Sequence, residues 1–311
     1  MHNLPPIASP TFMTLMPQES ARGVPPAVDV LPPPPDADLP DEPLVIIEPR
    51  NAWLSIDLAE LWRNRELLYF LTWRDIKVRY KQTLLGAVWA LLQPALMMII
   101  FTVVFSRLAG AVDGVPYPLF ALAGLVPWTF FANAVTNSGN SLVNNVQLVT
   151  KVYFPRLIMP AASVLAGLVD LAFSALLLGG MMLYYGIHIT SHLFMLPVLF
   201  ALTTLCALST GLWMSALNVK YRDVRFALPF IVQLWLFASS VVVPSSVVPD
   251  RVRWLLYLNP MSAIIEGCRA ALFSTPFHWK ALGIATALTM AGFAVAAHFF
   301  KQTERSFADF I

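Results

Sequence analysis

The chain has 311 residues, of which 58% are hydrophobic and only 12% are charged, and its mean hydropathy is +0.67. Soluble domains carry about 25% charged residues, so this composition excludes most soluble enzymes and predicts an integral membrane protein. The formal net charge of +2 gives no basic surface for nucleic acid.

The first fifty residues differ in composition from the rest of the chain. They hold 13 of the 25 prolines, including the run from Pro32 to Pro35, and seven acidic residues against two basic ones. Because proline at this density removes the backbone donors of helices and sheets, we expect residues 1–50 to form a disordered, acidic tail. The segment has no basic start followed by an apolar core, so it does not predict a secretory signal.

Residues 51–82 follow the pattern of an amphipathic helix. Its apolar side carries Leu54, Leu58, Leu61, Trp62, Leu68, Tyr69, Thr72 and Ile76. Most of the charged residues point the other way. A basic amphipathic helix with tryptophan at its apolar edge is typical of a helix that lies in the membrane interface.

Six apolar segments follow, each close to the roughly 20 residues that a helix needs to cross about 30 Å of hydrocarbon. They are residues 84–108, 119–138, 157–185, 196–217, 227–243 and 281–300. The fifth is the shortest, and Pro229 marks its start. The predicted fold class is therefore an all-α integral membrane protein, with six transmembrane helices in residues 83–311.

The loops between these segments set the orientation. Basic residues gather before the first span and after the second and fourth spans, whereas the loops after the first and third have neither lysine nor arginine. By the positive-inside rule both termini are cytoplasmic. The long outer segment 244–280 contains apolar stretches too short to span, so we expect two re-entrant or interfacial helices, separated at Asn259 and Pro260.

The sequence offers no constellation for catalysis. No glycine is followed by lysine, which excludes a P-loop and hence ATP binding of the Walker kind by this chain. His188 and His192 are spaced i, i+4 but have no acidic partner, and Cys206 and Cys268 lie in apolar surroundings as small hydrophobes. We predict no catalytic residue, no metal site and no cofactor on this chain.

Asp170 is the only acid near the middle of a predicted span, where a carboxylate costs about 2.5–3.5 kcal/mol on insertion scales. It is either a pore-lining or helix-pairing group, or a protonated packing residue. The aromatic residues near mid-depth either pack between helices and lipid or line a passage along which a sugar chain slides. The predicted channel-lining residues are Trp128, Phe130, Phe131, Asp170, Trp235 and Phe237.

The segment between the second and third spans has an apolar stripe of Leu142, Val146 and Val149, with amide side chains pointing elsewhere. This pattern predicts a short amphipathic cytoplasmic helix that ends near Tyr153. Such a helix is suited to insertion into a groove on a soluble partner. Ordinary loop packing is the alternative.

Four segments resemble the permease subunits of ABC exporters for polysaccharides and polyol phosphates, a family that includes the O-antigen, capsule and teichoic-acid export permeases. They are LLYFLTWRDIKVRYKQTLLGAVWALLQPALMMIIFTVVFSRLAG, LVTKVYFPRLIMP, LNVKYRDVRFALPFIVQLWLF and LNPMSAIIEGCRAALF. The resemblance covers residues 53–311 in collinear order and leaves residues 1–50 outside.

The resemblance implies a homodimer in the bacterial cytoplasmic (inner) membrane, with two separate ABC ATPase subunits that hold ATP and Mg. It further implies a lipid-linked polysaccharide as substrate. The segment 144–156 would be the coupling helix that receives the motion of the ATPase, and the turn after the fourth span would lie near it. The residues assigned to ATPase coupling are Asn144, Asn145, Val146, Lys151, Tyr153, Phe154, Pro155, Arg156, Lys220, Arg222 and Asp223.

By the same resemblance, the channel runs along the dimer seam and an undecaprenyl-linked glycan enters beside the interface helix. Arg74, Lys77, Arg79 and Lys81 would then bind the lipid diphosphate; a plain positive-inside anchor is the alternative. The residues assigned to an external gate are Trp254, Tyr257, Glu266 and Arg269, of which the last two are spaced i, i+3 and expected to pair.

Other functions stay open at this point. An ABC permease for another cargo, such as a drug or a different lipid, has the same topology. An ion-coupled secondary transporter would use Asp170, although such carriers normally show several intramembrane charged groups. A membrane-bound sugar-modifying enzyme should expose paired carboxylates or histidines, and the sequence shows none.

Overall fold

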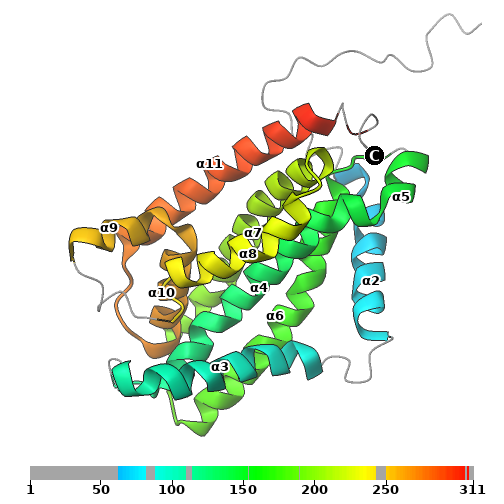
Figure 1. Ribbon diagram of the computed structural model, residues 1–311. Helices are drawn as coiled ribbons and strands as arrows, with labels where there is room; N and C mark the ends of the chain where they lie inside the picture. The colour runs from blue at the N-terminus through cyan, green and yellow to red at the C-terminus, as the bar shows by residue number, and fades with distance from the viewer. Residues whose placement is uncertain are drawn as a thin grey trace, which may run out of the picture. The chain divides into compact units, whose positions relative to one another are not determined.

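The computed structural model describes residues 62–81, 88–109, 114–152, 154–188, 190–242, 250–304 and 307. Within these ranges the chain is helical and has no strand (Figure 1). The elements are α2 (Arg65–Lys81), α3 (Val88–Ala109), α4 (Tyr117–Asn144), α5 (Val146–Lys151), α6 (Ile158–Tyr184), the 3-10 helix η1 (Ser191–Met195), α7 (Leu196–Lys220), α8 (Val224–Ala238), α9 (Asp250–Leu258), α10 (Pro260–Phe273) and α11 (Trp279–Glu304). The predicted tail, residues 1–50, lies outside the described residues, as do Leu54, Leu58 and Leu61 of the predicted amphipathic helix.

Five of the six predicted spans are confirmed as helices that are long and apolar enough to cross a membrane. These are α3, α4, α6, α7 with the preceding η1, and α11. In place of the predicted fifth span, residues 227–243, the structure has α8, a shorter apolar helix of 15 residues. At 1.5 Å per residue α8 is about 22 Å long, less than the roughly 30 Å of hydrocarbon in a bilayer.

The end of α8 is fixed by side chains from the segment that follows α9. Asn259 Nδ2 donates hydrogen bonds to the carbonyl of Ala238 (3.1 Å) and to Ser239 Oγ (2.9 Å). Arg269 donates to the carbonyls of Ser240 (2.5 Å) and Val241 (2.7 Å). Because carbonyls at and beyond a helix C-terminus need partners from elsewhere, these bonds stabilise a helix that stops at Ala238.

Helix α4 forms the core of the described bundle, and most of its residues are buried. It packs closely on α7 through small residues: a Cβ on Gly211 would collide with Ser138 Oγ, so the two helices touch almost backbone to backbone. Asn218 of α7 donates a 2.9 Å hydrogen bond to the carbonyl of Gly139 on α4. Close approach through glycine and serine is typical of helix pairs inside membranes.

Helix α2 packs lengthwise along the first half of α6. Leu71 is buried in a cluster with Ile158, and further along, Ser163 Oγ donates a 3.4 Å hydrogen bond to Asp75 Oδ2. Apolar side chains also project from the opposite side, where Trp62, Tyr69, Phe70 and Trp73 are exposed. The predicted apolar side is therefore divided: part of it contacts α6 and part is exposed. The interfacial placement of α2 stays a prediction.

The two short helices predicted before the last span are confirmed as α9 and α10. The break lies at Asn259, whose Oδ1 accepts a 3.1 Å hydrogen bond from the backbone N–H of Met261, while Pro260 occupies the first helical position. An asparagine cap followed by proline is a stable way to start a helix. Most of α10 is buried, in contrast to α9, which exposes Trp254, Leu255 and Leu258.

Candidate functional site

Asp170 of α6 is paired with two residues at the end of α2. Arg79 Nη1 donates to Asp170 Oδ2, and Tyr80 Oη donates to Asp170 Oδ1. Asp170 lies about 18 Å along α6 from Ile158, so this carboxylate is deep in a helix of membrane-spanning length. A charge at that depth needs a partner, and here the guanidinium of Arg79 supplies it.

The ion pair borders a cavity of about 270 Å³ between α2, α3, α4 and α6. Its wall combines amide and hydroxyl side chains with apolar and aromatic ones. The lining residues are Arg79, Tyr80, Trp89, Ala90, Gln93, Thr129, Phe130, Asn133, Asn137, Asp170, Leu171 and Ser174. Of the predicted channel-lining residues, the structure thus places Asp170 and Phe130 at one cavity.

Three of the other four predicted channel residues gather into an aromatic cluster between α4 and α8. The ring centroids of Trp128 and Phe131 are 5.5 Å apart, and those of Phe131 and Trp235 are 5.1 Å apart. Trp128 and Phe131 are buried within the single chain, which is the geometry of packing between helices. Phe237 is exposed and does not join them. Their lining of a channel stays a prediction.

Asn259 is a residue whose role the sequence did not indicate. Besides capping α10 and the end of α8, its Oδ1 accepts a 3.1 Å hydrogen bond from Trp235 Nε1. One amide thereby links α8 to the start of α10 and fixes the indole of Trp235. The Asn259–Pro260 dipeptide predicted only the break between helices, because nothing local to it points to Trp235.

The predicted ion pair between Glu266 and Arg269 is wrong. The guanidinium of Arg269 donates instead to the carbonyls of Phe120 (3.3 Å), Ser240 and Val241, and lies over the Phe120 ring. Glu266 Oε1 has no hydrogen-bond partner in the described part of the chain. The i, i+3 spacing brings the two residues to one side of α10, but the unpaired carbonyls after α8 are better placed to accept from Arg269.

Burial of Arg269 has an electrostatic consequence. Desolvation lowers the pKa of its guanidinium to about 9, against a smaller opposing effect of Glu266. The side chain is therefore still charged at neutral pH, inside the protein and bonded to backbone carbonyls. Of the other predicted gate residues, Trp254 is exposed and Tyr257 is half-buried against a small cluster of alanines on α10 and α11.

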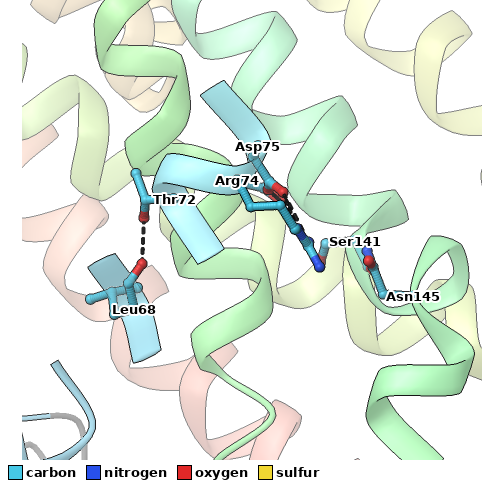
Figure 2. Close-up of polar contacts among 7 residues, drawn as sticks. Leu68, Thr72, Arg74, Asp75, Ser141 and Asn145 are labelled. Carbon is cyan, nitrogen blue, oxygen red and sulfur yellow. Dashed lines mark hydrogen bonds and ion pairs between the residues drawn. The ribbon is translucent and has the colours of Figure 1, made fainter. Parts of the chain in front are cut away.

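The four basic residues predicted for the lipid diphosphate fall into two groups: two bind a carboxylate and two are exposed. Arg74 donates to the neighbouring Asp75 (Nη2 to Oδ1, 2.9 Å), as Figure 2 shows, and Arg79 binds Asp170. Lys77 and Lys81 are exposed, and Lys77 Nζ lies 5.5 Å from the centroid of the Trp73 ring. Among these four residues, the exposed positive charge is thus carried mainly by the two lysines.

The predicted cytoplasmic helix is present as α5, between the end of α4 and the start of α6. Val149 is buried, while Gln147 and Lys151 are exposed, so α5 has one side on the bundle and one side open; Asn144 at the end of α4 is exposed beside it. Asn145 closes the end of α4 by donating a 2.8 Å hydrogen bond from Nδ2 to the carbonyl of Ser141; Figure 2 shows both residues. Val146 is half-buried, and Tyr153 lies outside the described residues.

Hydrogen bonds with α8 and α11 hold the two ends of the α5 region. Arg225 Nη2 donates a 2.6 Å hydrogen bond to Asn144 Oδ1, and Arg156 Nη1 donates a 3.0 Å bond to the carbonyl of Glu304. Arg156 also lies over the ring of Phe307. Arg225 and Glu304 were missed from the sequence, because only the fold brings them close to Asn144 and Arg156. Figure 1 shows α5 and α11 near the same end of the bundle.

The remaining residues assigned to coupling lie beside this region. Phe154 is buried and Pro155 is half-buried, so they anchor the chain between α5 and α6. Lys220, Arg222 and Asp223 are exposed in the turn between α7 and α8. Because Arg225 bonds to Asn144 just after this turn, the structure brings the two predicted coupling segments together.

Comparison with known proteins identifies the family. The sequence profile of the ABC-2 type transporter family matches residues 66–273, from the start of α2 to the end of α10. The chain belongs to the ABC-2 type transporter family. Members are non-catalytic membrane permeases that pair with ABC ATPase subunits, which accounts for the missing P-loop. This permease is accordingly a multi-pass membrane protein and not an enzyme.

The permease is similar to curated polysaccharide transport proteins. It is 29% identical to the O-antigen export system permease protein RfbA of Myxococcus xanthus over 219 residues, 70% of this chain and 84% of that protein. It is 26% identical to the protein of the same name from Klebsiella pneumoniae over 251 residues, 79% and 95% of the two chains. The polysialic acid transport protein KpsM of Escherichia coli is 23% identical over 206 residues, 64% and 78% of the two chains.

Proposed function

We propose that the permease exports a lipid-linked polysaccharide, of the O-antigen, capsular or teichoic-acid kind, across the bacterial cytoplasmic membrane. ATP hydrolysis on two separate ABC subunits drives the transport. The observation that carries this proposal is the similarity to an O-antigen export permease over 95% of that protein's length. Similarity of that extent spans nearly the whole of that relative.

The ATPase subunits dock, in this proposal, on the end of the bundle that carries α5 and the α7–α8 turn. Support comes from the open side of α5, with exposed Gln147 and Lys151, and from its rigid attachment through Arg225 and Arg156. Because this short helix is held at both ends, a movement of the docked ATPase subunit is transmitted to α4, α6, α8 and α11. This end is cytoplasmic, as are both termini.

The transport path lies at the seam of a homodimer, with α8 completing a sixth membrane-inserted helix. The exposed phenylalanines of α8, Phe226, Phe230 and Phe237, support this, because they leave a broad apolar side uncovered in the single chain. On α2, the exposed side chains of Lys77 and Lys81 bind the lipid diphosphate in this proposal. The segment of α9 and α10 forms the external gate.

Two alternatives are less well supported. An ion-coupled carrier needs an acid that takes up and releases a proton, but both oxygens of Asp170 already accept hydrogen bonds from Arg79 and Tyr80. An ABC permease for another cargo shares the family and the fold. Against it stands the similarity to two separate kinds of polysaccharide transporter, for O-antigen and for polysialic acid.

The test is a chromosomal deletion, with surface glycan and membrane-bound lipid-linked glycan measured in the same cells. We expect the surface glycan to disappear and the lipid-linked form to accumulate, with recovery when the full-length chain is restored. A tagged permease should also retain an ATPase subunit in mild detergent. A P-loop lysine variant of that subunit is the matched control and should cause the same accumulation. Unchanged surface glycan in the deletion strain would show that the cargo is something else.

A further inference from the structure

Three amide side chains from two membrane-spanning helices converge on the cavity beside Asp170. Gln93 of α3 and Asn137 of α4 are exposed in the single chain, and Asn133 is half-buried with its Nδ2 3.4 Å from Gln93 Oε1. An amide that faces hydrocarbon without a partner costs several kcal/mol, roughly 4–8 in a solvent that cannot form hydrogen bonds. This side of α3 and α4 therefore meets water, protein or a ligand and does not face lipid.

The cavity is electrically balanced. Among its lining residues only Arg79 and Asp170 carry charge, and they bind each other. Tyr80 Oη donates a hydrogen bond to the other oxygen of the same carboxylate. A guanidinium already held by a carboxylate has little remaining attraction for a phosphate, so this wall does not suit an anion.

The uncharged part of the wall combines two kinds of surface. Amides and hydroxyls can both donate and accept hydrogen bonds, which matches ligands that carry several hydroxyl groups. Trp89 is 54% exposed and adds a flat apolar ring next to them. A sugar ring has this dual character, with hydroxyl groups at its edge and C–H groups on its faces.

We propose that this cavity binds one neutral sugar unit of the exported glycan, with the amides of Gln93, Asn133 and Asn137 holding its hydroxyls and Trp89 stacking on a face. The proposal rests on the function proposed above. The volume of about 270 Å³ is below the roughly 300–1,000 Å³ of pockets that enclose drug-sized ligands, so the cavity accommodates a single ring and not a stretch of chain.

The two natural cysteines make a direct test feasible. Cys206 and Cys268 are buried, so they give little background with a hydrophilic thiol reagent. Ala90→Cys places a reporter thiol in the cavity wall without removing an amide. His278→Cys, an exposed position outside the cavity, and Val103→Cys, an exposed apolar position of α3, are the two controls.

Each reporter is introduced into the full-length chain, purified with its ATPase subunit and placed in lipid nanodiscs. We expect a charged thiol reagent to react at Ala90→Cys and His278→Cys, and only slowly at Val103→Cys. Millimolar methyl glycosides of glucose, galactose, mannose or N-acetylglucosamine should slow the reaction at Ala90→Cys alone. Inorganic pyrophosphate should have no effect there. Adding Asn133→Leu should weaken the protection about threefold to tenfold, as expected for one lost hydrogen bond, whereas Thr286→Val on α11 should not.

Several results would overturn the proposal. Protection by pyrophosphate would identify an anion site, and equal slowing at His278→Cys would show a non-specific effect. Failure of all four glycosides to protect, or of the reagent to reach Ala90→Cys, would exclude an accessible sugar site. The deletion experiment separates these failures from the proposed function. If the deletion abolishes surface glycan but no glycoside protects Ala90→Cys, the proposed export function stands and the proposed sugar site is wrong. If a glycoside protects but the deletion leaves surface glycan unchanged, the sugar site stands and the export function is wrong.

Discussion

Arg269 of α10 stacks on Phe120 of α4, with its Cζ 3.6 Å from the centroid of the ring. The same guanidinium donates to three backbone carbonyls, of which two follow the end of α8. One buried cation thus joins α4, α8 and α10 without a carboxylate partner. A planar guanidinium suits this role because it stacks on a ring through its face and donates along its edge.

Arg269→Met should destabilise the permease strongly. The substitution keeps much of the side-chain volume but leaves buried carbonyls without donors, each at a cost of about 1–3 kcal/mol. Arg269→Lys should rescue only part of the loss, because an ammonium cannot stack on Phe120 and donate in the same fork. The measurement is the midpoint of thermal unfolding of the purified protein in detergent. Full rescue by lysine would mean that charge alone matters at this position.

Gly124→Ala should produce a similar defect from the facing helix. A Cβ at Gly124 would lie 2.5 Å from Arg269 Nη2 and 3.3 Å from the carbonyl oxygen of Val241, so the guanidinium would have to move. Gly179→Ala on α6 is the matched control, because a Cβ there meets nothing within 4 Å. We expect a lower unfolding midpoint for the first variant and an unchanged or slightly raised one for the second. Equal behaviour of the two would contradict the proposed packing.

Arg79 and Asp170 should be strongly coupled in a double-mutant cycle. Asp170→Leu removes the carboxylate that Arg79 binds, Arg79→Met removes the guanidinium that binds Asp170, and the double variant removes both charges. We expect the double variant to be more stable than the sum of the single changes by about 0.5–3 kcal/mol, measured by denaturant unfolding. The cycle of Arg74→Met with Asp75→Leu is the comparison. Because that pair is more exposed, its coupling should stay below about 1 kcal/mol.

Gln147→Asp should separate ATPase docking from folding. Gln147 is exposed on the open side of α5, so the added charge should leave the amount of permease in the membrane unchanged. The proposed docking predicts that less ATPase subunit co-purifies and that export falls several-fold. His278→Asp, an exposed position outside this region, should change neither quantity. Normal co-purification with Gln147→Asp would place the docking surface elsewhere.

Hydropathy and local helix-breaking residues were enough to predict most of the helices. Five long apolar segments became five long helices, and Asn259 with Pro260 separated α9 from α10 as expected. These features depend on residues close together in the chain. The position where α8 ends does not depend on nearby residues alone, because it is stabilised by hydrogen-bond donors from Asn259 and Arg269, about 20 and 30 residues further along the chain.

The candidate site was only partly accessible from the sequence. Asp170 stood out as an intramembrane acid, but which of four nearby bases would reach it depends on how α2 runs along α6. The amides of Gln93, Asn133 and Asn137 went unnoticed, because each is unremarkable in its own helix and they converge only through the crossing of α3 and α4. The spacing of Glu266 and Arg269 was misleading, since carbonyl acceptors on other segments compete for the arginine.

The contact of Gly211 with Ser138 also limits how the permease can move. A glycine packed against a serine leaves little side-chain volume between the two helices that could repack into a second arrangement, and the Asn218 hydrogen bond to Gly139 adds to this. We therefore expect α4 and α7 to travel as one rigid body. We expect α3, which buries few of its side chains in the described bundle, to move more freely than this pair.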